Sequence, residues 1–169
     1  ILLFILPYQS LSARTVQKHR AIILTDIEAD PDDTQSLVRL LLYSNQIDLK
    51  GIVATTSCWQ RTSVHPDTLR NTIKAYGKVR KNLLKHEDGF PTEKYLLSIV
   101  AEGLPIYGML GVGEGKSSDG SELIISELEK EDARPLWVPV WGGVNTLAQA
   151  LYDIRATRSE TEAQALYRK

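Results

Sequence analysis

The strongest constraint on the fold is a repeated alternation between short apolar runs and amphipathic helical patterns. Residues 21–26 (AIILTD) are typical of a buried strand, segment 33–46 has the leucine spacing of a helix, and residues 48–56 return to a strand pattern. This alternation predicts an α/β fold, in which a mostly parallel sheet carries helices on both faces. We also expect helices at 66–86, 92–102, 121–131, 144–154 and 159–168, and a third strand at 135–141.

Polar or glycine-rich residues follow each of the three expected strands. The acidic stretch TDIEADPDD follows the first strand, TTSCW follows the second, and VWGG follows the third. Because ligands of parallel sheets bind outside the carboxyl ends of the strands, we expect the functional site at this edge. Trp59 and Trp141 lie at strand ends, where an indole ring could stack on a sugar, whereas Trp137 lies in mid-strand and is expected in the core.

The acidic stretch crowds five carboxylates, Asp26, Glu28, Asp30, Asp32 and Asp33, into eight positions. One explanation is that Asp30 or Asp32 caps the following helix while the other carboxylates complement the helix dipole. The other explanation is a hard cation, which takes oxygen ligands from carboxylates, carbonyls and water. Five carboxylates exceed what capping requires, so we favour a cation, and Ca²⁺ over Mg²⁺ because Mg²⁺ takes fewer protein ligands.

Several other catalytic and metal-binding motifs do not fit. An EF-hand loop needs a central Gly and a terminal Glu, which this short turn lacks. Zinc is disfavoured because the three His residues are scattered and Cys58 is the single cysteine, which also excludes an internal disulfide. The GEGKS segment at 113–117 lacks the first Gly of a phosphate-binding loop, so it is either an active-site loop or a plain surface loop.

Separated blocks of the sequence resemble one protein family. TDIEADPDD with the following QSL, then GIVATT, YGMLGVGEGK and VPVWGGVNTLAQAL, are similar to the nucleoside-hydrolase-like domain of a family named for a cellulose-binding bacterial protein. That domain is related to the calcium-dependent nucleoside hydrolases. The blocks agree in order from about residue 21 to the C-terminus. The resemblance implies hydrolysis of a glycosidic bond through an oxocarbenium-like transition state, with Ca²⁺ as cofactor.

The resemblance also implies roles for individual residues. Asp33 would be the main metal ligand, and Asp26 and the backbone carbonyl of Trp141 would be further ligands, which together form only part of the metal shell. Asp32 would face the sugar hydroxyls. The implied partner is therefore a small-molecule glycoside or a polysaccharide.

Two positions depart from the family pattern. Glu28 stands where nucleoside hydrolases carry the Asp that activates water, and where the cellulose-binding branch has Gly, so either Glu28 or Asp30 would be the catalytic base. Cys58 aligns near the Asn with which the hydrolases contact the sugar. Two function classes therefore stay open: a secreted glycosyl hydrolase, and a non-catalytic carbohydrate-binding module on the same fold. His65 could be a catalytic acid or an ordinary surface histidine.

The N-terminus carries an apolar run, ILLFILPY, followed by small residues up to Ala13. This pattern is typical of the back half of a secretory signal peptide, although a first buried strand or helix has a similar composition. We expect residues 1–13 to be a signal remnant, the protein to be secreted, and the domain to occupy 21–169. The run is too short to span a bilayer, and a net charge of −1 gives no basic excess for nucleic acid. Because the resemblance implies a considerably longer domain, we expect the chain to be a fragment.

Overall fold

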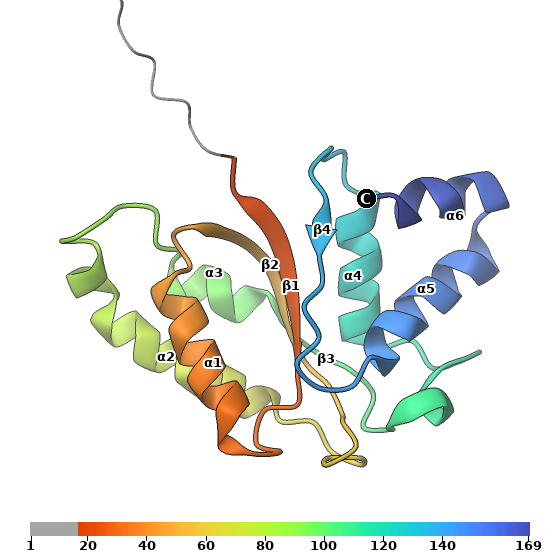
Figure 1. Ribbon diagram of the computed structural model, residues 1–169, viewed down its shortest axis with the longest axis horizontal. Helices are drawn as coiled ribbons and strands as arrows, with labels where there is room; N and C mark the ends of the chain where they lie inside the picture. The colour runs from red at the N-terminus through yellow and green to blue at the C-terminus, as the bar shows by residue number, and fades with distance from the viewer. Residues whose placement is uncertain (1–16) are drawn as a thin grey trace, which may run out of the picture.

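A computed structural model describes residues 17–169 and confirms the expected α/β fold (Figure 1). The strands are β1 (His19–Thr25), β2 (Ile47–Ala54), β3 (Val100–Glu102) and β4 (Leu136–Trp137). The helices are α1 (Pro31–Leu42), α2 (Pro66–Leu83), α3 (Glu93–Ser98), α4 (Asp119–Glu129), α5 (Asn145–Thr157) and α6 (Glu160–Tyr167), with a 3₁₀ helix η1 (Gly108–Gly111). The sheet has the order β3-β2-β1-β4, and its strands pair in parallel. The expected signal remnant at residues 1–13 lies outside the described residues.

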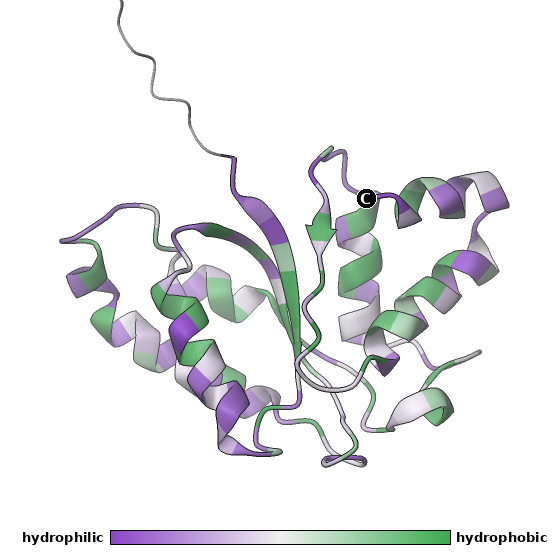
Figure 2. Ribbon diagram, in the orientation of Figure 1, coloured by the Kyte–Doolittle hydropathy of each residue, from purple (hydrophilic) through white to green (hydrophobic). Residues whose placement is uncertain are grey.

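Two hydrophobic clusters lie on opposite faces of the sheet. Successive side chains of a strand point to opposite faces, so in β1 Ala21 and Ile23 join one cluster while Ile22 and Leu24 join the other. Helices α1, α2 and α3 cover the first cluster, and α4, α5 and α6 cover the second (Figures 1 and 2). The central strands are therefore buried on both sides, which explains their continuous apolar character.

The first two helices begin at prolines that follow strand ends. Pro31 opens α1, and the side chain of Asp30 accepts a hydrogen bond from the backbone N–H of Asp32 at 3.2 Å, which caps the helix. Pro66 opens α2, where we expected a helix start. Within residues 17–169, no helix combines the length and the apolar character that crossing a membrane requires.

Three sequence-based expectations need correction. The helix expected over 92–102 is wrong in its second half, because α3 ends at Ser98 and residues 100–102 form β3, which pairs with β2. Pairing with a neighbouring strand outweighs the local helical pattern there. The strand expected over 135–141 is shortened to β4, with an isolated bridge at Val140, because Pro139 has no N–H to donate. Trp137 is 57% exposed and does not belong to the core.

Candidate functional site

The segments that follow β1, β2 and β4 come together at the carboxyl edge of the sheet, at the bottom of Figure 1. The backbone N–H of Gly143 donates to the carbonyl of Thr56 at 2.7 Å, which joins the VWGG turn to the segment after β2. Gly142 lies against Asp26, so closely that a Cβ atom at position 142 would be 2.7 Å from the Cβ of Asp26. The three features that we expected at one edge of the sheet are therefore neighbours.

A pair of carboxylates, Asp26 and Asp33, forms the centre of this edge. Their exposed fractions are 8% and 6%, and the two carboxyl groups lie within hydrogen-bonding reach of each other. The hydroxyl of Thr25 donates a hydrogen bond to Oδ2 of Asp33. β1 supplies Asp26 at its end, and the first turn of α1 supplies Asp33, so regular elements hold both side chains in place.

The electrostatics of the pair are unfavourable without a partner of opposite charge. Burial, and then the neighbouring Asp26 carboxylate, raise the pKa of Asp33 to about 6, while the hydrogen bond from Thr25 acts in the opposite direction. In the described part of the chain, neither Asp26 nor Asp33 forms an ion pair with Lys, Arg or His. The carboxylate pair therefore carries negative charge that the surrounding residues leave uncompensated at neutral pH.

The chemistry of the pair fits a hard cation. The two carboxylates present oxygen ligands of the kind that Ca²⁺ prefers, and the backbone of Gly142 lies directly against Asp26. Gly142 provides room for this arrangement, because a side chain there would collide with the Asp26 carboxylate. No group of three or more His, Cys, Asp or Glu side chains converges within residues 17–169 in a way that could hold a metal. Backbone carbonyls, water or ligand hydroxyls would therefore have to complete the shell.

Asp30 and Asp32 lie on the solvent side of the same turn. Asp30 is the N-cap of α1, so the capping explanation holds for this residue. The hydrogen bond with the Asp32 side chain lowers the pKa of Asp30 and raises the pKa of Asp32. Asp32 is exposed beside the buried Asp33, a position that a ligand from solvent can reach.

Glu28 has a backbone conformation that favours glycine, with a φ of 81°. Its carboxylate lies 3.1 Å from Nδ1 of His65 and accepts a hydrogen bond from the hydroxyl of Thr68 in α2. Glu28 thus joins the acidic turn to the start of α2, and it is not grouped with Asp26 and Asp33. Sequence reasoning missed Thr68 as the partner of Glu28, although the glycine that the cellulose-binding branch carries at the matching position was a signal of the left-handed backbone.

Trp59 and Trp141, the two candidate stacking residues, differ in exposure. Trp59 is 82% exposed in the loop after β2, whereas Trp141 is partly buried against the cluster covered by α1 to α3. Cys58, beside Trp59, is an exposed free thiol. Of these two tryptophans, Trp59 is therefore the one whose ring is open to a ligand from solvent.

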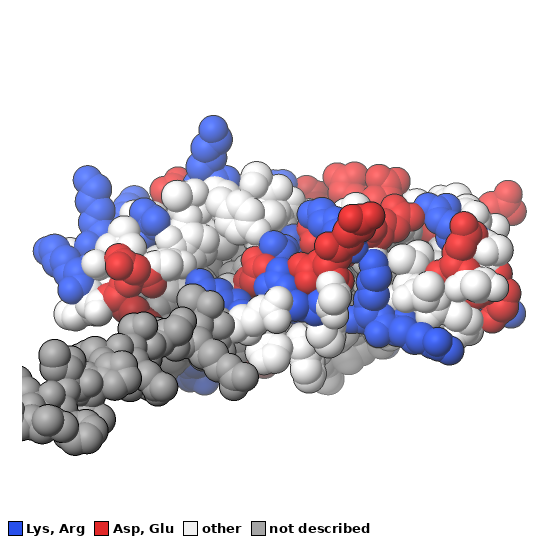
Figure 3. All heavy atoms as spheres, turned by 90° about the horizontal axis from the view of Figure 1, so that it is seen from above, with Lys and Arg blue, Asp and Glu red and all other residues white. Residues whose placement is uncertain are grey.

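The opposite edge of the sheet carries a second set of carboxylates, and these are neutralised. Arg134 bridges Asp48 at 2.8 Å and Asp132 at 2.6 Å, and Lys50 lies 2.9 Å from Asp48. Arg20, which is fully buried, lies 3.6 Å from Asp132. The side chains of opposite charge lie next to one another in the view onto this edge (Figure 3). Because basic side chains neutralise these carboxylates, we assign the network a role in stability and not in ligand binding.

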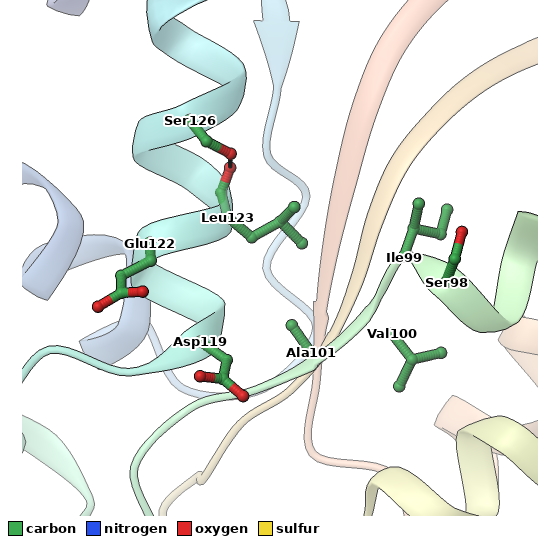
Figure 4. Close-up of a pocket in the computed structure, with 8 residues that line it drawn as sticks. All are labelled: Ser98, Ile99, Val100, Ala101, Asp119, Glu122, Leu123 and Ser126. Carbon is green, nitrogen blue, oxygen red and sulfur yellow. Dashed lines mark hydrogen bonds between the residues drawn. The ribbon is translucent and has the colours of Figure 1, made fainter.

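A groove of about 360 Å³ runs along the open edge of β3. Figure 4 shows that one wall comes from β3 and the residues before it and the other from α4. The lining residues are Ser98, Ile99, Val100, Ala101, Asp119, Glu122, Leu123 and Ser126. None of the site residues expected from the sequence lies in this groove, so we place the candidate site at the carboxyl edge.

Comparisons with known proteins agree with the α/β fold described above. The family model described as "Cellulose-binding Sde182, nucleoside hydrolase-like domain" matches residues 20–169. A solved structure of a nucleoside hydrolase-related hypothetical protein from Saccharophagus degradans, described as associated with carbohydrate metabolism, is 46% identical with a TM-score of 0.88. The match covers 90% of this chain and 37% of that one, so the chain spans little more than a third of that protein. No curated protein matches.

Proposed function

Because the chain belongs to the nucleoside hydrolase-like domain family of cellulose-binding Sde182, we propose that its carboxyl edge binds a sugar through a divalent cation and hydrolyses a glycosidic bond. The bond would be N-glycosidic or a related linkage. The proposed cation is Ca²⁺, and the proposed ligand is a small glycoside or a polysaccharide. A carbohydrate ligand agrees with the export signal expected at residues 1–13.

The observation that carries this proposal is the uncompensated pair of Asp26 and Asp33. Two buried carboxylates in contact repel each other, and burial, followed by the neighbouring Asp26 carboxylate, raises the pKa of Asp33 to about 6. A cation at the pair would remove the repulsion, so the site is suited to binding one. The edge at which the pair lies is also where parallel sheets bind their ligands.

The residues around the pair have distinct proposed roles. Asp26, Asp33 and the carbonyl of Trp141 would hold the cation, which supplies positive charge that attracts sugar hydroxyls and polarises water. Asp32, exposed next to Asp33, would accept hydrogen bonds from the sugar hydroxyls. Hydrolysis also needs a carboxylate that takes a proton from water, and Glu28 and Asp30 are the two candidates.

Carbohydrate binding without turnover is the second candidate function. The observation that favours it is the engagement of both candidate bases, because Glu28 contacts His65 and Thr68 while Asp30 caps α1. Both oxygens of the Glu28 carboxylate are used in these contacts, and Asp30 uses its Oδ1 for the cap. A site of this kind would keep the cation and the sugar contacts but lack the base.

Thermal unfolding of the 169-residue chain with and without Ca²⁺ tests the cation. At ten times the dissociation constant, a cation that binds only the folded state adds about 1.4 kcal/mol, which raises the unfolding midpoint by about 3–6 °C. We expect Asp33→Asn to abolish this shift and Asp119→Asn, in the groove of β3, to keep it. An equal shift in wild type and Asp33→Asn would refute the assignment of Asp33.

A hydrolysis assay separates the two candidate functions. The chain is incubated with Ca²⁺ and a panel of nucleosides and aryl glycosides, and release of the base or the aglycone is measured. Turnover that Asp33→Asn abolishes supports the hydrolase. Glu28→Gln and Asp30→Asn then identify the base, because only the base variant loses turnover while keeping the Ca²⁺ shift. Ca²⁺-dependent sugar binding without any turnover supports the binding module.

A further inference from the structure

An aromatic surface, made of Trp59 and the stacked pair Arg61 and Tyr107, lies at the same edge of the sheet as the carboxylate pair, and of these residues only Trp59 is among the candidate site residues. Trp59 is 82% exposed, which is unusual for a side chain with so large an apolar area. The loop that carries Trp59 is nevertheless held by hydrogen bonds. The backbone N–H of Trp59 donates to the hydroxyl of Ser57 at 3.1 Å, and the N–H of Ser57 donates to the carbonyl of Gln60 at 3.0 Å. The indole ring is thus presented to solvent on an ordered turn.

A hollow of about 340 Å³ opens two residues further along this loop. The guanidinium of Arg61 lies over the ring of Tyr107, with 5.7 Å between its central carbon and the ring centroid. The N–H of Tyr107 donates to the carbonyl of Arg61 at 3.0 Å, so the loop after β2 and the loop after β3 are joined. The lining residues are Arg61, Thr62, Pro105, Ile106, Tyr107 and Leu110.

The hollow is preorganised by contacts with the rest of the edge. The side chain of Asn145, at the start of α5, donates to the carbonyl of Ile106 at 3.3 Å and accepts from the hydroxyl of Thr56 at 3.1 Å. Thr56 in turn accepts the N–H of Gly143, which follows the glycine packed on Asp26. A continuous set of contacts therefore links the carboxylate pair to Trp59 and to the hollow, and little ordering is needed when a ligand binds there.

We propose that Trp59 and the Arg61–Tyr107 hollow bind the second and following rings of a sugar chain whose first ring lies at the carboxylate pair. The ligand class is then an oligosaccharide or polysaccharide and not a free nucleoside. An indole face packs against the C–H face of a pyranose, and a guanidinium donates hydrogen bonds to ring hydroxyls. This inference rests on the proposed function, because it extends the same sugar site along the edge.

The inference is tested by calorimetric titration of the 169-residue chain with cellobiose, cellotetraose and cellohexaose in the presence of EDTA. Removing the cation isolates the aromatic surface from the carboxylate pair. We expect affinity to increase with chain length, and Trp59→Ala to weaken cellohexaose binding by about tenfold or more. Trp59→Phe should restore part of the loss, and Tyr107→Ala should also weaken binding.

Trp137→Ala is the matched control. Trp137 is another exposed tryptophan, but it lies in β4 and packs against the ring of His19 at the opposite end of β1. It should leave cellohexaose binding unchanged. Equal affinities of wild type and Trp59→Ala, or equal losses in Trp59→Ala and Trp137→Ala, would overturn the inference.

Two further comparisons identify the ligand class and separate this inference from the proposed cation site. If adenosine binds in EDTA as tightly as cellohexaose and competes with it, the aromatic surface binds nucleosides and the ligand class is wrong. The loss of the Ca²⁺ shift in Asp33→Asn depends on the carboxylate pair, whereas chain-length dependence in EDTA depends on Trp59. Failure of either result therefore leaves the other measurement intact.

Discussion

The two ends of the central strands carry similar carboxylates in opposite electrostatic situations. At the amino end, Arg134, Lys50 and Arg20 surround Asp48 and Asp132. At the carboxyl end, Asp26 and Asp33 lie in contact without a basic partner in the described part of the chain. Hydrogen bonds from Arg134 lower the pKa of Asp132, whereas burial raises the pKa of Asp33 to about 6.

The difference shows that charged side chains stabilise the amino end of the sheet and destabilise its carboxyl end. Ion pairs of Arg134 with Asp48 and Asp132, at 2.8 and 2.6 Å, hold the amino end of the sheet together. An uncompensated pair makes the carboxyl end less stable and leaves it able to bind a cation, and perturbed groups of this kind concentrate at functional sites. The predictions below test this contrast, beginning with the change expected to have the largest effect.

Removal of Arg20 should have the largest effect on stability. This side chain is fully buried, donates to the carbonyl of Glu127 at 3.2 Å and lies beside Asp132. Arg20→Ala leaves a cavity the size of a fully buried side chain and removes the hydrogen bond to Glu127, so we expect the free energy of unfolding to fall by about 3–5 kcal/mol. Urea unfolding at neutral pH measures the change.

The control for Arg20 is Arg158→Ala. Arg158 pairs with Glu129 at the surface, with an N–O distance of 2.5 Å, and exposed pairs of this kind contribute little. Its replacement should leave the unfolding curve almost unchanged. If both variants unfold like the wild type, the amino-end network does not stabilise the sheet.

The two ends should respond to pH with opposite signs. Asp33 has a folded-state pKa of about 6, above its usual value of 3.8, so its contribution to stability falls as pH rises from about 4 to about 6. In EDTA this decrease should amount to about 2 kcal/mol, and Asp33→Asn should remove it. Burial raises the pKa of Asp48, but hydrogen bonds from Lys50 and Arg134 leave it lower than usual. The stability that Asp48 contributes at neutral pH is therefore lost as pH falls below about 4.

Urea unfolding between pH 3 and pH 8 distinguishes these effects. At each pH, the free energy of unfolding of the variant is subtracted from that of the wild type. The difference in free energy of unfolding for Asp33→Asn should fall between pH 4 and pH 6 and then stay constant. The difference for Asp48→Asn should be about 1 kcal/mol at pH 7, because a partly exposed charged hydrogen bond is lost, and should shrink in acid. Differences with the same sign of slope would contradict the contrast between the two ends.

Glu28 should give the smallest effect. Its left-handed backbone, with a φ of 81°, costs a residue with a side chain about 1 kcal/mol relative to glycine. Both Glu28→Ala and Glu28→Gly lose the contacts with His65 and Thr68. Alanine still pays the cost of the left-handed backbone, whereas glycine adopts this conformation without that cost. The glycine variant should therefore be more stable than the alanine variant by about 0.5–1 kcal/mol in thermal unfolding. Equal stabilities would show that the turn relaxes in the variants.

Local sequence patterns predicted most of the fold because its central strands are long and buried on both faces. The run AIILT and the leucines of α1 identify β1 and α1, and Pro66 marks the start of α2. The edge strands were harder to predict. β3 has three residues and follows α3 after Ile99, so its strand character comes from pairing with β2 and not from a local pattern.

The candidate site could be predicted only in part for a similar reason. Asp26 and Asp33 are close in sequence, and the strand and helix that flank them determine that they meet. The contact between Glu28 and His65 joins two separate loops, and no local pattern predicts it. The stacking of Arg61 on Tyr107 likewise depends on how the loops after β2 and β3 are placed.

The position of Gly142 against Asp26 bears on the order in which the protein folds. Asp26 and Asp33 belong to one β-strand–helix unit, β1 and α1, whose contacts are short-range and form early. Gly142 lies more than a hundred residues after Asp26 in the sequence, so the loop that it closes has a larger entropic cost. We therefore expect the acidic turn to be open to water and ions in folding intermediates, with the backbone of residues 141–143 packing onto it in a late step. A cation in the surrounding medium could then be captured during folding, before the last side of the site is closed.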